Sequence, residues 1–344
     1  MKKLFAIILF LSLLLSARDG YKVIKDMDDQ MVEVPVNPQR IACMHGVSTD
    51  RIVTLGRGSS LVMAMKASPW ALKLYPEMEK VEVINPPYTG NIEKMINLKT
   101  DLVLYSPFPG EAAKYRAAGI SAACGFAPNK RPRSMNDFGE NFKRQFRFFG
   151  ELLGGDAAKR AEKYCAYFDK KMEKILAVTS KLKDRDKPSV YYGGRTAGNL
   201  LTGQGRDSVL HWFVKAAGGN FSPAAIDSNF IEVNMEKVIS WDPDIILISG
   251  WGNALDSVKK NKAWASMRAV KNDNIYLIPQ GIFAWEFASG ESVLMTIYMA
   301  KIFHPKLFAD WDIIKEMTEF YSEIYGRKIT AGDAERILKC LPPL

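Results

Sequence analysis

The chain lacks the residue arrangements with which common enzyme classes do their chemistry. Its three histidines, His45, His211 and His304, are far apart, so the H-E-x-x-H spacing of a zinc-binding helix is absent. Neither G-x-S-x-G nor G-x-x-x-x-G-K-[ST] occurs, and Gly203-Gln-Gly205 is too short to be a dinucleotide fingerprint. These absences favour a binding protein over an enzyme, and we predict no cofactor and no metal site.

Large aromatic and cationic residues follow directly after several predicted strands, often beside Gly or Pro. Ligands of open parallel sheets lie beyond the carboxyl ends of the strands. We therefore predict a ligand cleft that involves His45, Trp70, Tyr88, Phe108, Arg195, Arg206, Trp251, Phe283 and Trp285. The alternatives stay open: the aromatic side chains and His45 could pack beneath loops, and the two arginines could be solvated.

One stretch of the chain occurs twice and indicates how these strand ends are positioned. Residues 91–106 (NIEKMINLKTDLVLYS) align without a gap with residues 234–249 (NMEKVISWDPDIILIS), 143 positions later. Each copy predicts a short amphipathic helix, a turn and a run of four apolar residues, which is typical of a strand buried on both faces of a parallel sheet. Two such copies suggest two α/β lobes of similar design.

The order of the other predicted elements gives the domain organisation. Strands and helices alternate through residues 18–155 and again through residues 184–344, a pattern that favours doubly wound parallel sheets. A β-hairpin is predicted over residues 21–34. Residues 156–183 contain no Gly or Pro and show helical periodicity, so we predict a single long helix that joins the two lobes.

Glu93 and Glu236 occupy the same position in the two copies of the repeat. A carboxylate near a helix N-terminus is electrostatically favourable, and this alone could explain either residue. Their symmetric placement on two lobes suggests instead a pair of docking charges.

The first 17 residues have the form of a secretory signal peptide, because a basic start precedes 12 mostly apolar residues, too few to span a bilayer. We expect an exported, periplasmic protein without a lipid anchor, since no cysteine is near.

The formal net charge is +9, but there is no basic stripe with interleaved aromatics, so nucleic acid is not an expected partner. The four cysteines, Cys43, Cys124, Cys165 and Cys340, have no metal-type spacing. A Cys43–Cys124 disulfide and buried free thiols both remain open.

Several short motifs, taken in order, resemble one known family. They are Pro35-x-x-Pro38-Gln-Arg40-Ile, Leu55-Gly56, Asn91-x-Glu93, Thr100-Asp101-Leu-Val, Leu152-Leu-Gly154, Gly218-Gly219-Asn220, Asn234-x-Glu236, Pro243-Asp244 and His304-Pro305 with Phe308. The chain resembles the class III periplasmic substrate-binding proteins of ABC importers for ferric siderophores, cobalamin and haem. The resemblance covers residue 20 to the C-terminus, and Thr100 replaces the family's common Pro.

The resemblance implies two Rossmann-like lobes joined by a rigid helix, with the ligand between them. It also implies that Glu93 and Glu236 dock onto arginines of the membrane permease, while the variable ligand residues cannot be transferred. We predict a monomeric protein that binds an iron chelate, a ferric siderophore first. Cobalamin, haem or a nickel complex held by His45 is the alternative within the family. An exported redox metalloprotein is the alternative from another class, although the scattered cysteines supply no visible cluster site.

Overall fold

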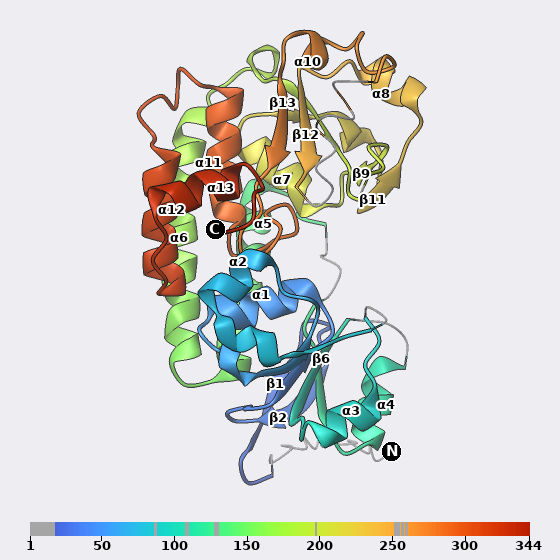
Figure 1. Cartoon of the computed structure of the whole chain (residues 1–344), viewed down its shortest axis with the longest axis vertical. Coiled ribbons are helices and arrows are strands. Elements are labelled where there is room, and N and C mark those ends of the chain that lie inside the picture. The colour runs from blue at the N-terminus through green and yellow to red at the C-terminus, as the bar shows by residue number, and fades with distance from the viewer. Residues whose placement is uncertain are drawn as a thin grey trace, which may run out of the picture.

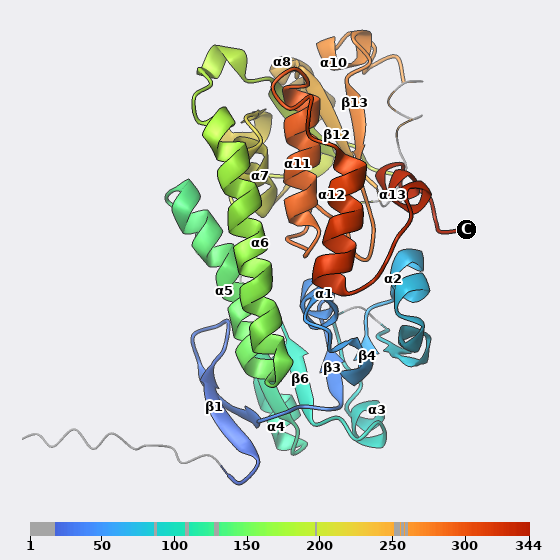
Figure 2. The ribbon, with the colours of Figure 1, turned by 90° about the vertical axis from the view of Figure 1, so that its left-hand side faces the viewer.

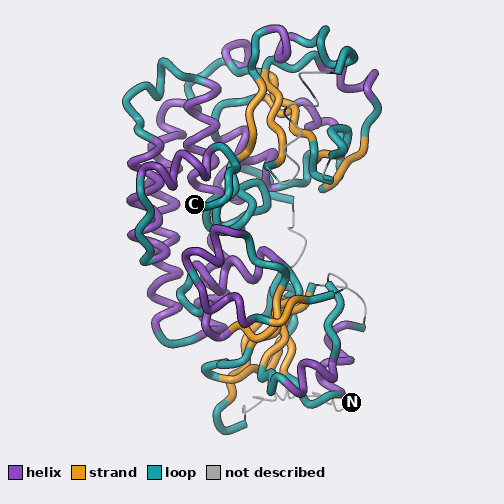
Figure 3. The backbone as a smooth tube through the Cα atoms, in the orientation of Figure 1, coloured by secondary structure: helices purple, strands orange, loops and turns teal. Residues whose placement is uncertain are grey.

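The structure is a computed structural model, and it describes residues 18–85, 88–106, 110–126, 131–196, 198–250, 255, 258 and 261–344. The chain forms two α/β lobes, one at each end of the molecule (Figure 1). The strands gather into separate groups in the two lobes, each accompanied by helices (Figure 3). This architecture confirms the predicted fold class.

The first lobe is built on a five-stranded parallel sheet. Its order is β5 (Glu82–Val83), β4 (Leu61–Ala64), β3 (Ile41–Cys43), β6 (Leu102–Tyr105) and β7 (Ser121–Cys124). Its helices are α1 (Gly46–Thr54), α2 (Pro69–Leu74), α3 (Ile92–Asn97) and α4 (Glu111–Ala117). The predicted hairpin is present as β1 (Tyr21–Lys25) and β2 (Met31–Pro35). The Asp26 carboxylate anchors this hairpin to β7, because it accepts a hydrogen bond of 2.9 Å from the Cys124 backbone N–H.

The second lobe contains a four-stranded parallel sheet. Its order is β10 (Asn220–Phe221), β8 (Ser189–Gly193), β12 (Ile245–Ser249) and β13 (Ile275–Ile278). The helices here are α7 (Val209–Ala216), α8 (Met235–Trp241), α10 (Arg268–Lys271) and α11 (Ser292–Phe303). An antiparallel pair, β9 (Thr202–Gln204) with β11 (Phe230–Glu232), was not predicted, because two three-residue strands far apart in the sequence give almost no periodic signal.

Two long helices connect the lobes. The helix α5 (Met135–Leu153) leads into α6 (Asp156–Thr179), which runs along one side of the molecule past both lobes (Figures 1 and 2). The buried face of α6 carries Tyr164, whose ring stacks on Phe146 of α5 at 3.6 Å between centroids. At its end, Thr179 donates a hydrogen bond of 2.8 Å to the Ala216 carbonyl of α7. A helix held along its length in this way resists bending between the lobes.

The C-terminal segment returns to the first lobe. It consists of α12 (Ile313–Phe320), a π-helical turn (Tyr321–Tyr325) and α13 (Ala331–Leu338). Lys73 of α2 forms an ion pair of 2.9 Å with Asp333 of α13, and the Trp70 indole donates to the Leu341 carbonyl at 2.9 Å. The end of the chain therefore links the two lobes on a second path besides α6.

Candidate functional site

The carboxyl ends of the first-lobe strands bring three ring side chains together. His45 follows β3 and is the residue before the first turn of α1. Its imidazole stacks on Phe126, which follows β7, at 4.4 Å, and lies 6.0 Å from the Tyr88 ring. Burial and the nearby Arg51 lower the pKa of His45 to about 4, so the imidazole is neutral at pH 7. Its buried Nδ1 has no hydrogen-bond partner among the described residues.

Arg195 provides the cationic counterpart on the second lobe. It follows β8 through Gly194, whose φ of +84° is one that glycine adopts without strain. The guanidinium lies 3.4 Å from the centroid of the Phe230 ring and 5.9 Å from that of Phe287. Its buried Nε has no hydrogen-bond partner, and no described carboxylate forms an ion pair with this arginine.

Residues of both lobes affect the pKa of Arg195. Burial lowers this pKa, and interactions with Tyr192 and Tyr88 oppose the effect. Tyr88 belongs to the first lobe and Arg195 to the second, so these side chains are close enough to interact electrostatically across the space between the lobes. A half-buried arginine that lacks an anionic partner is a suitable contact for an anionic ligand.

The Phe283 ring of the second lobe lies against Gly46, the first residue of α1. A Cβ placed on Gly46 would come within 2.7 Å of the Phe283 ring, so only glycine allows this approach of the second lobe to α1. A cavity of about 320 Å³ lies beside the ring. Both lobes line it: α1 and residues 65–71 on one side, and Gln280, Ile282 and Phe283 on the other.

Three other predicted ligand residues are buried or already paired. Trp70 and Trp285 are fully buried, which matches the alternative of packing beneath loops. Arg206 is exposed and forms an ion pair of 3.2 Å with Asp227. Phe108 and Trp251 lie outside the described residues.

A group of buried polar side chains between the lobes was not predicted as a group. The Asp50 carboxylate of α1 accepts hydrogen bonds of 2.8 Å from Arg51 and from the Gly290 backbone N–H, and Arg51 donates to the Ala288 carbonyl. Glu291 accepts one from the Phe283 backbone N–H at 2.9 Å and another from Tyr321. Charged residues in a helix sequence are normally exposed, so no local pattern indicates that this part of α1 is buried.

Two carboxylic acids in this region have pKa values raised toward neutral pH. Burial raises the pKa of Glu291 to about 8, and hydrogen bonds from Phe283 and Tyr321 only partly oppose it. Burial likewise raises the pKa of Glu286 to about 7, although the Ser249 hydroxyl donates to it at 2.7 Å. Glu286 directly follows Trp285, a predicted ligand residue, but was not itself predicted to belong to the site.

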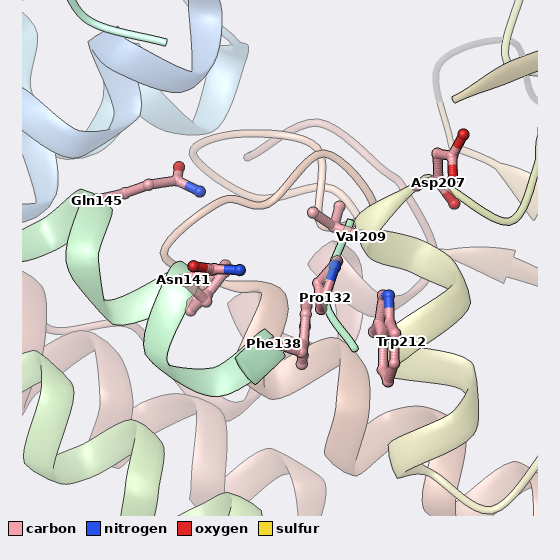
Figure 4. Close-up of a pocket in the computed structure, with 9 residues that line it drawn as sticks. Pro132, Phe138, Asn141, Gln145, Asp207, Val209 and Trp212 are labelled. Atoms are coloured by element: carbon pink, nitrogen blue, oxygen red, sulfur yellow. The ribbon is translucent and has the colours of Figure 1, made fainter. Parts of the chain in front are cut away.

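A second pocket lies between α5 and α7, as Figure 4 shows for Pro132, Phe138, Asn141 and Trp212. Its volume is about 10 Å³, which is room for a single water molecule at most. This volume excludes it as a site for a metal chelate. In the described part of the chain, no group of three or more His, Cys, Asp or Glu side chains could hold a metal ion, and all four cysteines are free thiols.

The two repeat helices have matching geometry. Asn91 accepts a hydrogen bond of 3.0 Å from the Lys94 backbone N–H at the start of α3, and Asn234 accepts one of 2.8 Å from Lys237 at the start of α8. Glu93 and Glu236 are exposed in the first turns of these helices. Figure 1 shows α3 and α8 in different lobes, both on the side of the molecule opposite α6.

Comparison with known proteins assigns this architecture. A family model described as "Periplasmic binding protein" matches residues 41–281. The chain belongs to the periplasmic binding protein family. Its class is the one whose members bind siderophores, haem and cobalamin, and the chain is a substrate-binding protein of an ABC importer, not an enzyme. None of its described helices is long and apolar enough to cross a membrane.

Two relatives of this periplasmic binding protein carry names with different ligands, molybdate and iron. "Molybdate-binding protein MolA" of Haemophilus influenzae is 23% identical over 343 residues, covering 92% of this chain and 94% of the relative. The "Iron-uptake system-binding protein" of Bacillus subtilis is 25% identical over 233 residues, covering 61% and 68%. A crystal structure of the Haemophilus influenzae protein bound to molybdate matches with a TM-score of 0.79 at 19% identity, covering 90% of this chain and 99% of that one.

Proposed function

We propose that this periplasmic binding protein captures an anionic metal compound between its lobes, with Arg195 as the charged contact and His45 and Tyr88 as neutral contacts. The unpaired guanidinium of Arg195 carries the proposal. The Phe230 and Phe287 rings offset only part of the hydration that this partly buried cation loses, and a bound anion would supply the missing ionic interaction. The unpartnered Nδ1 of His45 adds a second polar atom on the opposite lobe.

A compact oxyanion of the molybdate type is our first candidate for this ligand. Tyr88 and Phe283 are the predicted aromatic contacts that are neither fully buried nor outside the described residues. Two rings offer limited stacking surface to a ring-bearing chelate, whereas one arginine and one imidazole suit a small anion. The name of the Haemophilus influenzae relative supports this choice.

A ferric siderophore, the ligand predicted from the sequence, is the second candidate. The cavity of about 320 Å³ beside Phe283 is mostly apolar in its lining and could take part of such a chelate. The name of the Bacillus subtilis iron-uptake relative supports this reading. Cobalamin, haem and nickel complexes remain further alternatives.

Isothermal titration of the purified protein tests the ligand and the site together. We expect sodium molybdate to bind saturably, and Arg195→Ala to weaken binding by about 30-fold or more, since losing one partner of a desolvated charge contact costs about 2–5 kcal/mol. Arg206→Ala is the matched control, because that guanidinium is exposed and already paired with Asp227. Binding of a ferric catecholate siderophore and not of molybdate would select the second candidate. Equal binding by wild type and Arg195→Ala would contradict the proposed site.

Delivery to the permease is proposed to depend on Glu93 and Glu236. Both carboxylates are exposed, lie at equivalent positions of the two lobes and have no described ion-pair partner. Reversing both charges, as Glu93→Lys with Glu236→Lys, should abolish uptake of the ligand by cells while leaving its affinity for the purified protein unchanged. Glu173→Lys with Glu335→Lys reverses two exposed carboxylates on α6 and α13 and should leave uptake intact. A loss of ligand affinity in the first variant would count against docking.

A further inference from the structure

The identical residues of the two repeats fall into two groups when their contacts are compared. In the first group the fold explains the residue. Asn91 and Asn234 cap their helices, as described above. Asp101 accepts hydrogen bonds from the backbone N–H groups of residues 39 and 40 at 2.7 and 3.1 Å, and Asp244 accepts from the N–H and hydroxyl of Ser189 at 2.9 and 2.8 Å. Each aspartate thereby fixes the start of the neighbouring strand.

In the second group the fold gives no reason for the residue, apart from the favourable position of an acid near a helix N-terminus. Glu93 and Glu236 belong here, and so do Ile96 and Ile239. The isoleucines are 54% and 44% exposed, although they lie on helices whose other large apolar side chains are more covered. Single exposed apolar residues are common and need no explanation. Here, however, two such residues occupy equivalent positions in two lobes.

The spacing places each isoleucine beside a docking glutamate. Glu93 and Ile96 are three residues apart on α3, and Glu236 and Ile239 are three apart on α8, so each pair shares one helix face. Each lobe therefore presents the same small patch, an anionic group next to an exposed branched alkyl group. Both helices lie on the side of the molecule opposite α6 (Figure 1). A partner that fits these patches has a basic side chain beside an apolar surface, and it presents that combination twice.

We infer that Ile96 and Ile239 are apolar contacts for the membrane permease and act together with Glu93 and Glu236. The inference rests on the proposed docking role of the two glutamates and adds to it. The charged pairs at the rim of an interface mainly steer association, whereas buried alkyl groups slow dissociation. The isoleucines thus hold the complex that the glutamates orient.

The first experiment identifies the partner by position. A photo-crosslinking amino acid is placed at residue 96, 239 or 307 of the full chain, which is expressed in its source cells. Leu307 is the control, because it is 51% exposed and follows α11, outside the repeats. We expect residues 96 and 239 to form adducts with a membrane-spanning subunit of an ABC importer, identified by mass spectrometry, and residue 307 to form none. Adducts with another protein, or equal adducts from residue 307, would overturn the inference.

The second experiment measures the contribution of the side chains. The permease so identified is reconstituted in nanodiscs, and its binding to the double variant Ile96→Ser with Ile239→Ser is measured. We expect about tenfold weaker binding or more, mainly through faster dissociation, because roughly half of each isoleucine surface loses an apolar contact. Leu307→Ser should bind like wild type. Light scattering of the free variants serves as a check, and an altered oligomeric state in the isoleucine variant would assign the patches to self-association and overturn the inference.

The glutamate variant separates the two proposals. The glutamate variant Glu93→Lys with Glu236→Lys could bind more weakly while the isoleucine variant binds like wild type. That result would support the docking role of the glutamates and contradict the role of the isoleucines. If both variants bind like wild type, the proposed docking surface itself is contradicted. Weakened binding by both, with ligand affinity unchanged, is the expected result.

Discussion

The two lobes are alike on their outer helices and different at their inner strand ends. On the outside, α3 and α8 repeat the same capping asparagine, the same exposed glutamate and the same exposed isoleucine. On the inside, Ser106 and Ser249 end equivalent strands but have different surroundings. The Ser249 hydroxyl donates to the buried Glu286, whereas the Ser106 hydroxyl has no hydrogen-bond partner among the described residues.

The outer helices and the inner strand ends suit different kinds of partner. Matching outer patches suit a partner that presents the same complementary patch twice. Unlike inner surfaces, with a neutral imidazole on one lobe and a free guanidinium on the other, suit a small ligand whose two sides are contacted differently. Under the two proposals, the repeat supplies matching docking patches, and the ligand contacts lie outside the part of the repeat that matches.

The largest effect is expected where the inner surfaces of the lobes meet. Arg51→Met removes the partner of Asp50 and the hydrogen bond to Ala288 of the other lobe, both fully buried. Losing one member of a buried ion pair should lower the free energy of unfolding by about 3–5 kcal/mol. Urea denaturation measures it, with Arg206→Ala as an exposed control. A loss below about 1 kcal/mol would mean that this contact does not hold the lobes together.

The pH dependence of stability tests the buried acids of the inner surface. The pKa of Glu291 is raised to about 8, so the folded protein holds a proton that the unfolded chain releases above pH 4.5, and stability falls as the pH rises toward 8. Near pH 8, His45 is neutral in both the folded and the unfolded state, so it contributes little there. Glu291→Gln should reduce a slope of up to about 1.4 kcal/mol per pH unit.

In Glu291→Gln the free energy of unfolding should still fall with pH, but with a smaller slope, because the pKa of Glu286 is also raised, to about 7. Glu93→Gln on the exposed face of α3 is the control and should show the wild-type slope. An unchanged slope in Glu291→Gln would show that another buried group carries the pH dependence.

Single charge reversals at Glu93 and Glu236 test whether the two outer patches are equivalent. If the two patches are equivalent, Glu93→Lys and Glu236→Lys should each weaken permease binding, by about tenfold at low salt and less at high salt. We expect their dissociation constants to agree within about threefold. A silent variant on one lobe would break the equivalence and indicate that only one patch docks.

The smallest effect is expected from the two equivalent serines. Ser249→Ala removes a hydrogen bond to a buried acid and should lower the free energy of unfolding by about 1–2 kcal/mol. Ser106→Ala removes a buried hydroxyl that has no partner and should be neutral or slightly stabilising. Equal losses in the two variants would mean that the inner strand ends are more alike than their contacts indicate.

The sequence by itself determined the local elements and their order. Apolar runs of four residues became β6 and β12, and the hairpin and the long helix α6 formed where their periodicity predicted them. These features depend on the preferences of residues close together in the chain, which periodic patterns record. The repeat also fixed the positions of Glu93 and Glu236 on matching helices before any tertiary contact was known.

Only the tertiary structure decided which side chains face the cleft. Trp70 and Trp285 follow strands as Tyr88 and Phe283 do, yet they are buried by distant segments, Trp70 by a hydrogen bond to Leu341 at the end of the chain. Asp50 and Arg51 look like surface charges in the sequence and are buried because residues 288–290 cover them. Burial and pairing depend on segments more than 200 residues apart, and no local pattern contains that information.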